Sequence, residues 1–301
     1  MNAVWITGAT GFTGSYLVDF LKNVVELPSV IGLARSQPVS VRTDAFYPVD
    51  LTVPGAVLEI AEEVPPAVVF HLAGLAPPAD EAKMWHLNVG GTVQLLHGLA
   101  AAGCTDCTVV CAGSAAEYRM ASTEPLDENS PCGGAAPYGF SKWSQTLAAL
   151  NLGKELGIKV MIARPFNLVG PKLPQHLVAG ALCAQFADVD GKEVRVGNVQ
   201  SERDFIDIRD TVEAYWKIAE YGEAGEVYNV CSGKPTSIQQ LLTIFSDLSP
   251  SEKQIVTETA RMKSVDLDCI YGSNDKLNRV SGWQPRISLE QSVHDMLETV
   301  G

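Results

Sequence analysis

The chain has 301 residues, 46% of them hydrophobic and 19% charged, a composition typical of a globular protein large enough to bury a substantial core. Its net charge is −13, from 22 basic and 35 acidic residues, which argues against nucleic acid and an anionic membrane surface as partners. The sequence shows neither a secretory signal nor a hydrophobic run long enough to span a membrane. Its seven cysteines are scattered through apolar segments, so we expect a cytoplasmic protein with reduced thiols.

A glycine-rich turn follows the first predicted strand, Ala3–Thr7. Apolar residues between positions 16 and 21 then recur at helical spacing. Glycines between a strand and a helix permit a tight turn and let backbone N–H groups approach a pyrophosphate at the helix N-terminus. We therefore predict a dinucleotide-binding turn, rather than a plain strand-to-helix turn, made up of Gly8, Thr10, Gly11, Phe12, Thr13 and Gly14.

Strands and helices alternate regularly up to about residue 165. A long helix is predicted at Glu81–Ala102, and further strands at Val30–Ala34, Phe46–Val49, Ala67–Leu72, Cys107–Cys111 and Val160–Ala163. This alternation predicts an α/β fold with a doubly wound parallel sheet over residues 1–165.

The rhythm changes after residue 165, where the predicted elements become shorter. We expect residues 166–301 to form mainly a smaller α/β annex that binds the substrate, with the chain returning to the sheet around 204–232. Within this part, Arg203–Asp210 alternates charged and apolar residues. The alternation predicts that half of its side chains face solvent or a partner.

Arg35 and Asp50 follow the second and third predicted strands. An acidic residue about twenty positions past the glycines would hold the ribose 2′-hydroxyl of NAD, whereas Arg35 in that region favours the 2′-phosphate of NADP. The alternative is a solvated loop arginine. Asp50, with Leu51 after it, could meet the adenine amino group.

Tyr138 and Lys142 are predicted to share one face of a helix that begins after Pro137. An ammonium beside a phenol stabilises the phenolate, so the tyrosine could exchange a proton nearer neutral pH than its usual pKa of about 10. Alone, such a pair can equally be an ordinary surface pair of a helix. Ser114 lies at the carboxyl end of a predicted strand, where its hydroxyl could hold a substrate carbonyl beside Tyr138.

Four further polar residues could have either a functional or a structural role. Asn88 either orders the network around the active site or is a simple polar helix position, and His71 is interpreted as a packed structural histidine. Cys104 and Cys107 have zinc-like spacing, but neither a second pair nor clustered histidines accompany them, so no metal is expected.

Along nearly its whole length, the chain resembles the extended short-chain dehydrogenase/reductase (NAD-dependent epimerase/dehydratase) family. The resemblance implies a Rossmann-type fold, a nicotinamide cofactor and usually a nucleotide-diphosphate sugar substrate. It also implies a catalytic triad of Ser114, Tyr138 and Lys142. The matching motifs are Gly8–Gly14, Asp50-Leu51, His71-Leu72-Ala73, Asn88–Thr92, Ser114, Tyr138 with Lys142, and Arg164–Asn167.

The cofactor implied by the resemblance is NADP, as NADPH, with NAD as the other possibility. Besides the glycine turn, the residues assigned to it are Arg35, Asp50, Leu51, Leu72, Ala73, Gly74, Asn88, Tyr138, Lys142 and Pro165.

Within the family, Arg164–Asn167, Arg203–Asp210 and Tyr228–Gly233 look most like the GDP-4-keto-6-deoxy-mannose reductases. We therefore expect NADPH-dependent reduction of the 4-keto group of a nucleotide-diphospho-4-keto-6-deoxy sugar. The alternatives are a nucleotide-sugar 4-epimerase, a reductase of other ketones and a non-catalytic NADP-binding regulator. The residues that this resemblance assigns to the substrate are Ser114, Asn167, Arg203, Arg261 and Asp266. The two arginines suit a diphosphate, because a guanidinium fork matches phosphate oxygens.

Several positions depart from the family pattern. The related 4,6-dehydratases need a glutamate two residues before the tyrosine that matches Tyr118, but Ala116 stands there, and Glu117 in an extended segment would point to the opposite side. Arg119 and Ser264 replace a common glycine and a common proline, which leaves the sugar and the base open. By resemblance we also expect a homodimer that pairs the helices around 81–102 and 138–157.

Overall fold

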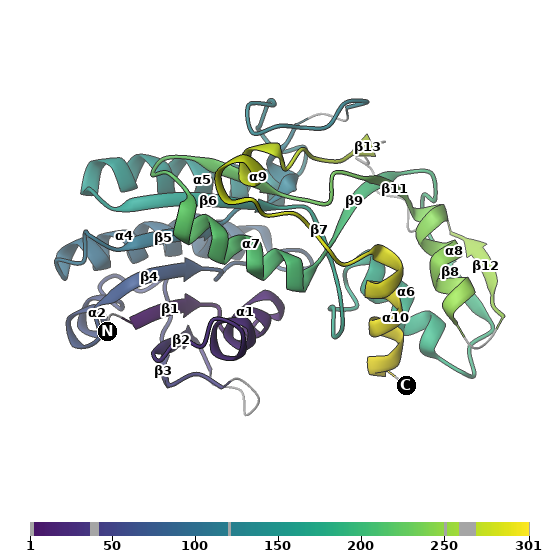
Figure 1. Ribbon diagram of the computed structural model, residues 1–301, viewed down its shortest axis with the longest axis horizontal. Helices are drawn as coiled ribbons and strands as arrows, with labels where there is room; N and C mark the ends of the chain where they lie inside the picture. Colours follow the sequence, from purple (N-terminus) through teal and green to yellow (C-terminus); the bar gives the residue numbers. More distant parts are fainter. Residues whose placement is uncertain (1–2, 37–41, 120–121, 250–251, 259–268, 301) are drawn as a thin grey trace.

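The computed structural model describes residues 3–36, 42–119, 122–249, 252–258 and 269–300. Its centre is a seven-stranded parallel sheet in the order β10-β6-β5-β4-β1-β2-β3, with helices on both faces (Figure 1). The doubly wound sheet predicted from the sequence is thus confirmed. The strands in chain order are β1 (Ala3–Thr7), β2 (Val30–Ala34), β3 (Ala45–Pro48), β4 (Pro66–His71), β5 (Thr108–Ala112), β6 (Lys159–Pro165) and β10 (Val227–Val230).

The two faces of this sheet carry separate hydrophobic cores. One core is covered by α1 (Phe12–Asn23), α7 (Ile208–Tyr221) and α9 (Asp275–Ser281), and the other by α2 (Leu58–Glu63), α4 (Thr92–Ala101) and α5 (Pro137–Leu156). The single helix expected at 81–102 is instead a helical run of three segments: α3 (Glu81–Trp85), the π-helical η1 (His86–Gly91) and α4.

The register of the parallel strands brings their carboxyl ends to one edge of the sheet. Thr7 at the end of β1 pairs with Leu33 of β2 and with His71 of β4, and His71 pairs with Cys111 of β5. The segments that follow these strands therefore lie side by side, which is the arrangement that places ligands in such sheets.

The second part of the chain forms smaller sheets and a third core. β9 (Glu202–Asp207) pairs with β7 (Asn167–Val169), β11 (Pro235–Ser237) and β13 (Cys269–Ile270), while β8 (Glu193–Val196) pairs with β12 (Gln254–Thr257). The helices α6 (Val178–Ala187), α8 (Ile238–Leu248) and α10 (Leu289–Val300) pack against them. Figure 1 shows this part beside the carboxyl edge of the large sheet.

The prediction that half of Arg203–Asp210 faces solvent or a partner is wrong. The three acidic residues of the segment, Asp204, Asp207 and Asp210, are buried, because donors from distant segments surround their carboxylates. Asp204 accepts hydrogen bonds from both the amide and the hydroxyl of Ser232, and from the amides of Gly233 and Gly272. Burial raises the pKa of Asp204 to about 6, and these donors oppose the rise.

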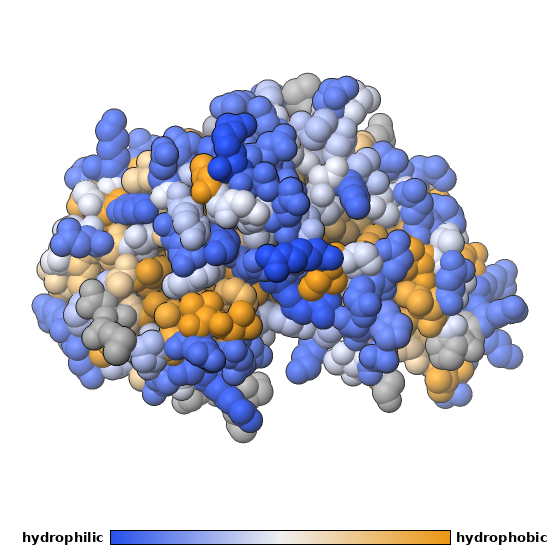
Figure 2. Space-filling view, viewed as in Figure 1, coloured by the Kyte–Doolittle hydropathy of each residue, from blue (hydrophilic) through white to orange (hydrophobic). Residues whose placement is uncertain are grey.

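Hydrophilic side chains cover most of the face seen in Figure 2, and apolar side chains gather over α1 and near α6 and α8. None of the helices in the described ranges is long and apolar enough to cross a membrane.

Candidate active site

Two cavities lie along the carboxyl edge of the large sheet. The first, which we call the glycine-turn cavity, has a volume of about 630 Å³ and is lined by residues that follow β1, β2, β3 and β4. The second, the Tyr138 cavity, has a volume of about 530 Å³ and is lined by residues that follow β5 and β6 and by part of the smaller sheets. One loop borders both, since Leu75 lines the first and Ala76 the second.

Most residues predicted to bind the cofactor line the glycine-turn cavity. They are Gly8, Thr10, Gly11, Arg35, Asp50, Leu51, Leu72, Ala73 and Gly74. Phe12, Thr13 and Gly14 are not among its lining residues. They form the first turn of α1, where the ring of Phe12 packs on that of Tyr16 with a centroid distance of 5.4 Å.

The glycine turn requires glycine for two different reasons. Gly8 has φ +69°, and a Cβ there would lie 2.9 Å from the amide nitrogen of Ala73. A Cβ at Gly14 would lie only 2.2 Å from the carbonyl oxygen of Gly8. The tight turn predicted here is therefore present, with the amide of Gly11 donating to the carbonyl of Gly8 at 3.0 Å.

The outer end of the glycine-turn cavity gathers basic side chains in an otherwise acidic protein. Arg35 is joined there by Lys83 and His86, which the sequence analysis did not single out. Asp50 accepts hydrogen bonds from the hydroxyl and the amide of Thr52, which lower its pKa, and the charges of Arg35 and His86 lower it further. The only sequence signal for Lys83 and His86 was their place in the helix that carries Asn88.

The Tyr138 cavity brings together predicted residues from four segments: Ser114, Tyr138, Pro165, Asn167 and Arg203. Ser114 hydrogen-bonds to the phenol of Tyr138, which lowers the pKa of that phenol, but burial and the charge of Glu117 raise it, and the net direction is upward. The lowered pKa predicted from the neighbouring lysine is thus wrong for this structure. The phenol is protonated at neutral pH, the form that can donate a proton.

Lys142 is buried behind the wall of the glycine-turn cavity and lines neither cavity. It is 6% exposed, and its ammonium donates to the main-chain oxygen of Ala112 and to Oε1 of Gln145, each at 2.5 Å. A Cβ at Gly74, in the wall of the glycine-turn cavity, would lie 3.9 Å from the lysine nitrogen. Burial lowers the pKa of Lys142.

A buried ion pair supports the turn that carries Ser114. Residues Ala115–Glu117 form a 3₁₀ turn (η2), so the extended segment expected there is absent. Glu117 is fully buried: its Oε1 accepts from the amide of Ser114 at 2.7 Å, and its Oε2 accepts from Thr146 and from Arg164, whose Nη2 is 2.9 Å away. Both oxygens of the Glu117 carboxylate are therefore bonded to groups of the protein itself. Ala116, at the sequence position where the dehydratases have their glutamate, lines the Tyr138 cavity.

Asn88 and His71 lie behind the cavities. Asn88 is fully buried, and its side chain bonds to both main-chain polar groups of Leu75 and to the hydroxyl of Ser141. It thus fastens the loop that borders both cavities, although it lines neither. His71 bonds through both ring nitrogens to Thr7 and Thr92, in agreement with the structural role expected for it.

Of the five residues predicted to bind the substrate, the structure describes Ser114, Asn167 and Arg203. Asn167 donates to the carbonyl of Asp204 at 3.2 Å, and Arg203 donates to the carbonyl of Glu202 at 2.7 Å. Arg261 and Asp266 lie outside the described residues. The cavity is also lined by His176, Leu177 and Val178 at the start of α6, in a segment without a chemical motif.

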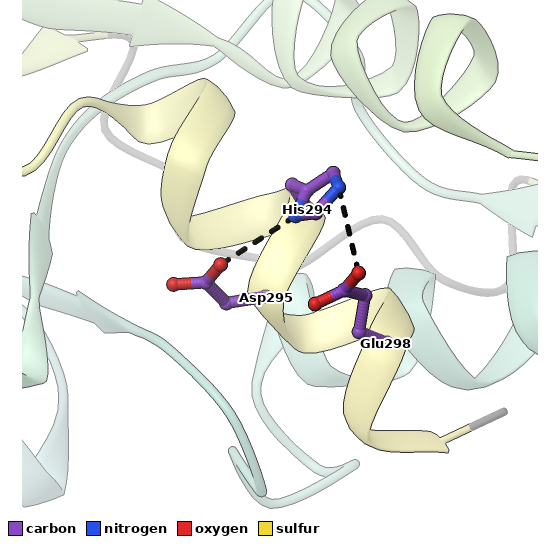
Figure 3. Close-up of side chains that lie close together, drawn as sticks. All are labelled: His294, Asp295 and Glu298. Carbon is purple, nitrogen blue, oxygen red and sulfur yellow. Dashed lines mark ion pairs between the residues drawn. The ribbon is translucent and has the colours of Figure 1, made fainter.

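One side-chain cluster in the described part of the chain has the composition of a metal site. His294, Asp295 and Glu298 place ligand atoms within 4.8 Å of one another on α10 (Figure 3). Asp295 is already used by an ion pair with Arg209 at 2.7 Å and a hydrogen bond from Gln291. We therefore interpret these three residues as part of an ordinary charged helix surface.

Comparisons with known proteins agree with this geometry. The model of the NAD dependent epimerase/dehydratase family matches residues 4–231. A GDP-6-deoxy-D-mannose reductase of Pseudomonas aeruginosa is 31% identical, over 98% of this chain and 95% of that one.

Solved structures are similar in fold over the whole chain. One is titled as RMD from Pseudomonas aeruginosa complexed with NADPH, with a TM-score of 0.86 and 29% identity, covering 100% of this chain and 99% of that one. Another is a putative epimerase from Burkholderia cenocepacia, with a TM-score of 0.89 and 28% identity over 99% and 98% of the two chains. The Rossmann-type fold implied by the sequence resemblance is thereby confirmed.

Replacing Glu117 by glutamine should destabilise the protein strongly. The substitution leaves the Arg164 charge buried without its counter-charge, and the free energy of unfolding should fall by about 3–5 kcal/mol. The matched control is Glu220→Gln, which breaks the partly exposed Lys217–Glu220 pair and should cost less than about 0.5 kcal/mol. Urea unfolding of both variants tests this, and equal losses would show that the buried pair contributes no more than a surface pair.

Proposed function

The chain belongs to the NAD dependent epimerase/dehydratase family, and on this premise we propose that it is an NADPH-dependent reductase of a nucleotide-diphospho-4-keto-6-deoxy sugar. The observation that carries the proposal is the protonated Tyr138, bonded to Ser114 in the wall of one cavity, with Lys142 reaching the wall of the other. The similar GDP-6-deoxy-D-mannose reductase supports the choice among the activities of the family.

The glycine-turn cavity fits a nicotinamide dinucleotide. The backbone at Gly8 and Gly14 leaves no room for side chains, and the cavity of about 630 Å³ is lined by segments that follow four parallel strands, where dinucleotides bind in such sheets. Bound there, NADPH would supply the hydride that reduces the keto carbon.

The residues of the chain supply binding and proton chemistry. Ser114 would hold the substrate carbonyl oxygen, and Tyr138 would donate its phenolic proton to that oxygen as negative charge develops on it. Lys142, with two of its N–H groups held by the protein, would direct the third toward the cofactor ribose, and its charge would stabilise the tyrosinate left behind.

The sugar nucleotide would occupy the Tyr138 cavity. Arg203 and His176 line it as basic groups that suit a diphosphate, together with the neutral amide of Asn167. The dehydratase reaction is disfavoured, because Glu117 is bound to Arg164 behind the cavity.

The test is oxidation of NADPH by the purified protein with freshly prepared GDP-4-keto-6-deoxy-mannose, alongside the dTDP-, CDP- and UDP-linked keto sugars. Stoichiometric oxidation with one of them would establish the reductase and identify the nucleotide. Interconversion of 4-epimers by protein that carries its own cofactor, without net oxidation, would replace the proposal with the epimerase alternative.

Tyr138→Phe should remove most of the turnover and leave cofactor binding intact. Loss of the proton donor should lower kcat by about 10²- to 10⁴-fold, while the dissociation constant for NADPH, measured by fluorescence titration, should stay unchanged. Tyr221→Phe, at a half-exposed tyrosine on α7, is the matched control. A Tyr138→Phe variant with near wild-type kcat would mean that another group donates the proton.

Arg35→Ala should shift the cofactor preference from NADPH toward NADH. A charge-assisted contact to the 2′-phosphate corresponds to about tenfold to a hundredfold in affinity, so the NADPH dissociation constant should rise by that factor while that of NADH changes little. Arg279→Ala, at an exposed arginine on α9, controls for the lost charge. Equal weakening of both cofactors would place Arg35 outside the 2′-phosphate site.

We further propose that the chain forms a homodimer through α5. Its buried face is small and polar, whereas Phe140 and Leu147 on the outer face are 44% and 42% exposed, and Phe140 contacts Trp85 and Trp143. Exposed apolar side chains that adjoin an aromatic cluster shared by α3 and α5 are typical of an interaction surface.

Size-exclusion chromatography with light scattering should give twice the 32.2 kDa of one chain. Leu147→Glu should shift the mass to that of one chain, whereas Val24→Glu, at an exposed valine after α1, should not. A monomeric wild-type protein would end this proposal.

A further inference from the structure

A continuous chain of buried hydrogen bonds leads away from Lys142. Gln145, which follows it on the same face of α5, accepts from the ammonium at Oε1 and donates from Nε2 to the hydroxyl of Thr92 at 3.0 Å. That hydroxyl lies 2.8 Å from Nε2 of His71, whose Nδ1 lies 2.8 Å from the hydroxyl of Thr7. The chain thus runs from α5 through α4 and β4 to the end of β1, and all five side chains are buried.

The direction of each bond follows from the inventory of donors and acceptors. Thr92 donates its hydroxyl proton to the carbonyl of Asn88 at 2.7 Å, so its oxygen can only accept from Gln145 and His71. His71 must therefore carry its proton on Nε2, and its Nδ1 accepts from Thr7. Burial lowers the pKa of His71 to about 3, which keeps the imidazole neutral in this form.

One orientation of the Gln145 amide follows. Its nitrogen faces the Thr92 oxygen and lies 3.2 Å from the sulfur of Cys111, and its oxygen faces the ammonium of Lys142. The reverse orientation would turn an NH₂ group toward the ammonium and a carbonyl oxygen toward a hydroxyl that has no proton left to give. With Ala112, Gln145 then holds two of the three N–H groups of Lys142.

We propose that Gln145 is a positioning residue for Lys142, and that Thr92 and His71 act on the lysine by fixing the orientation of the Gln145 amide. The inference rests on the proposed function in that it assigns Lys142 to the cofactor and to Tyr138. The far end of the chain reaches the cofactor side as well, since the hydroxyl of Thr7 accepts from the amide of Ala73, a residue in the wall of the glycine-turn cavity.

The ionisable groups around Lys142 affect its pKa and are therefore considered before its titration. Burial lowers its pKa, and the negative charge that opposes this at pH 7 is that of Glu117 in the η2 turn. Burial raises the pKa of the Cys111 thiol on β5 to about 11, so Cys111, His71 and Tyr138 are all neutral at pH 7. An oxygen that accepts from the charged form raises the pKa of a lysine. Removing the Gln145 oxygen should therefore lower the pKa of Lys142 further.

The experiment measures Lys142 directly, in full-length protein without any sugar substrate. The protein is labelled with ¹³C at the ε-carbons of lysine, the Lys142 signal is assigned by its loss in Lys142→Met, and its pKa is followed by NMR. NADPH affinity is measured by fluorescence titration. Gln145→Leu should lower the pKa of Lys142 by about one unit or more and raise the NADPH dissociation constant about tenfold to a hundredfold, the range of a hydrogen bond to a charged group.

Substitutions at Thr92 separate positioning from packing. Thr92→Val removes the acceptor for the amide without touching Lys142, and it should shift the lysine pKa and the NADPH dissociation constant in the same direction as Gln145→Leu. Thr92→Ser keeps the hydroxyl and should restore both. Thr211→Val is the matched control, because Thr211 is equally buried and bonds to a main-chain oxygen four residues earlier, so it should lower the melting temperature without moving Lys142.

The proposal is overturned if Thr92→Val leaves the pKa of Lys142 at the wild-type value, or if Gln145→Leu binds NADPH as tightly as the wild type. These results do not depend on the sugar assay. Failure to reduce any keto sugar, with the shifts present, would remove the proposed reaction and keep the positioning network. Reduction of a sugar without the shifts would keep the proposed reaction and remove the positioning network.

Discussion

The constraint on which the rest of the site depends is the burial of a lysine ammonium inside the protein. An isolated charge in such a place costs several kcal/mol, and side chains of this type usually lose the charge instead. Here the ammonium of Lys142 is surrounded by oxygen acceptors from the end of β5 and from α5 itself. The carboxyl edge of the sheet supplies the first acceptor, and a network that extends through three further elements orients the second.

This constraint accounts for the composition of α5. A helix that packs on a sheet ordinarily buries an apolar stripe, but the buried face of α5 is made of small and polar residues, among them Gly139, Ser141, Lys142, Gln145 and Thr146. Glycine is needed where the helix begins, because a Cβ at Gly139 would lie 2.0 Å from the carbonyl oxygen of Ala116. Leu150, Leu152 and Leu156 pack against the core of the sheet, whereas Phe140 and Leu147 are exposed. One helix thus supports the site with one face and carries exposed apolar side chains on another.

A second site of buried charge is the ion pair of Glu117 and Arg164. Arg164 and Glu117 neutralise each other, and the carboxylate also accepts from the amide of Ser114. The position of the serine hydroxyl thus depends on an ion pair whose members are 47 residues apart. The same carboxylate contributes to the raised pKa of Tyr138, which keeps the phenol protonated.

The errors of the sequence analysis share one physical origin. The acidic residues of the 203–210 segment were expected partly in solvent because charged side chains usually are, but Asp204 is satisfied by amides that arrive from residues 232, 233 and 272. The pKa of Tyr138 was judged from its helical neighbour Lys142, whereas burial by the rest of the molecule is the largest cause of its shift and raises it. Lys83, His86 and His176 lack any motif, and only the fold brings them to the cavities.

By itself, the sequence determined the parallel sheet, the glycine turn and the placement of Tyr138 and Lys142 on one helix. Each of these depends on residue spacing within one element or between two consecutive ones, and local geometry is enough to infer it. Only the tertiary structure decided the protonation of Tyr138, the burial of Glu117 with Arg164 and the orientation of the Gln145 amide. These depend on partners that lie on different elements, such as Glu117 with Arg164, 47 residues apart, and Thr92 with Gln145, 53 residues apart. A buried polar group takes its state from whichever partners the fold brings within hydrogen-bonding distance.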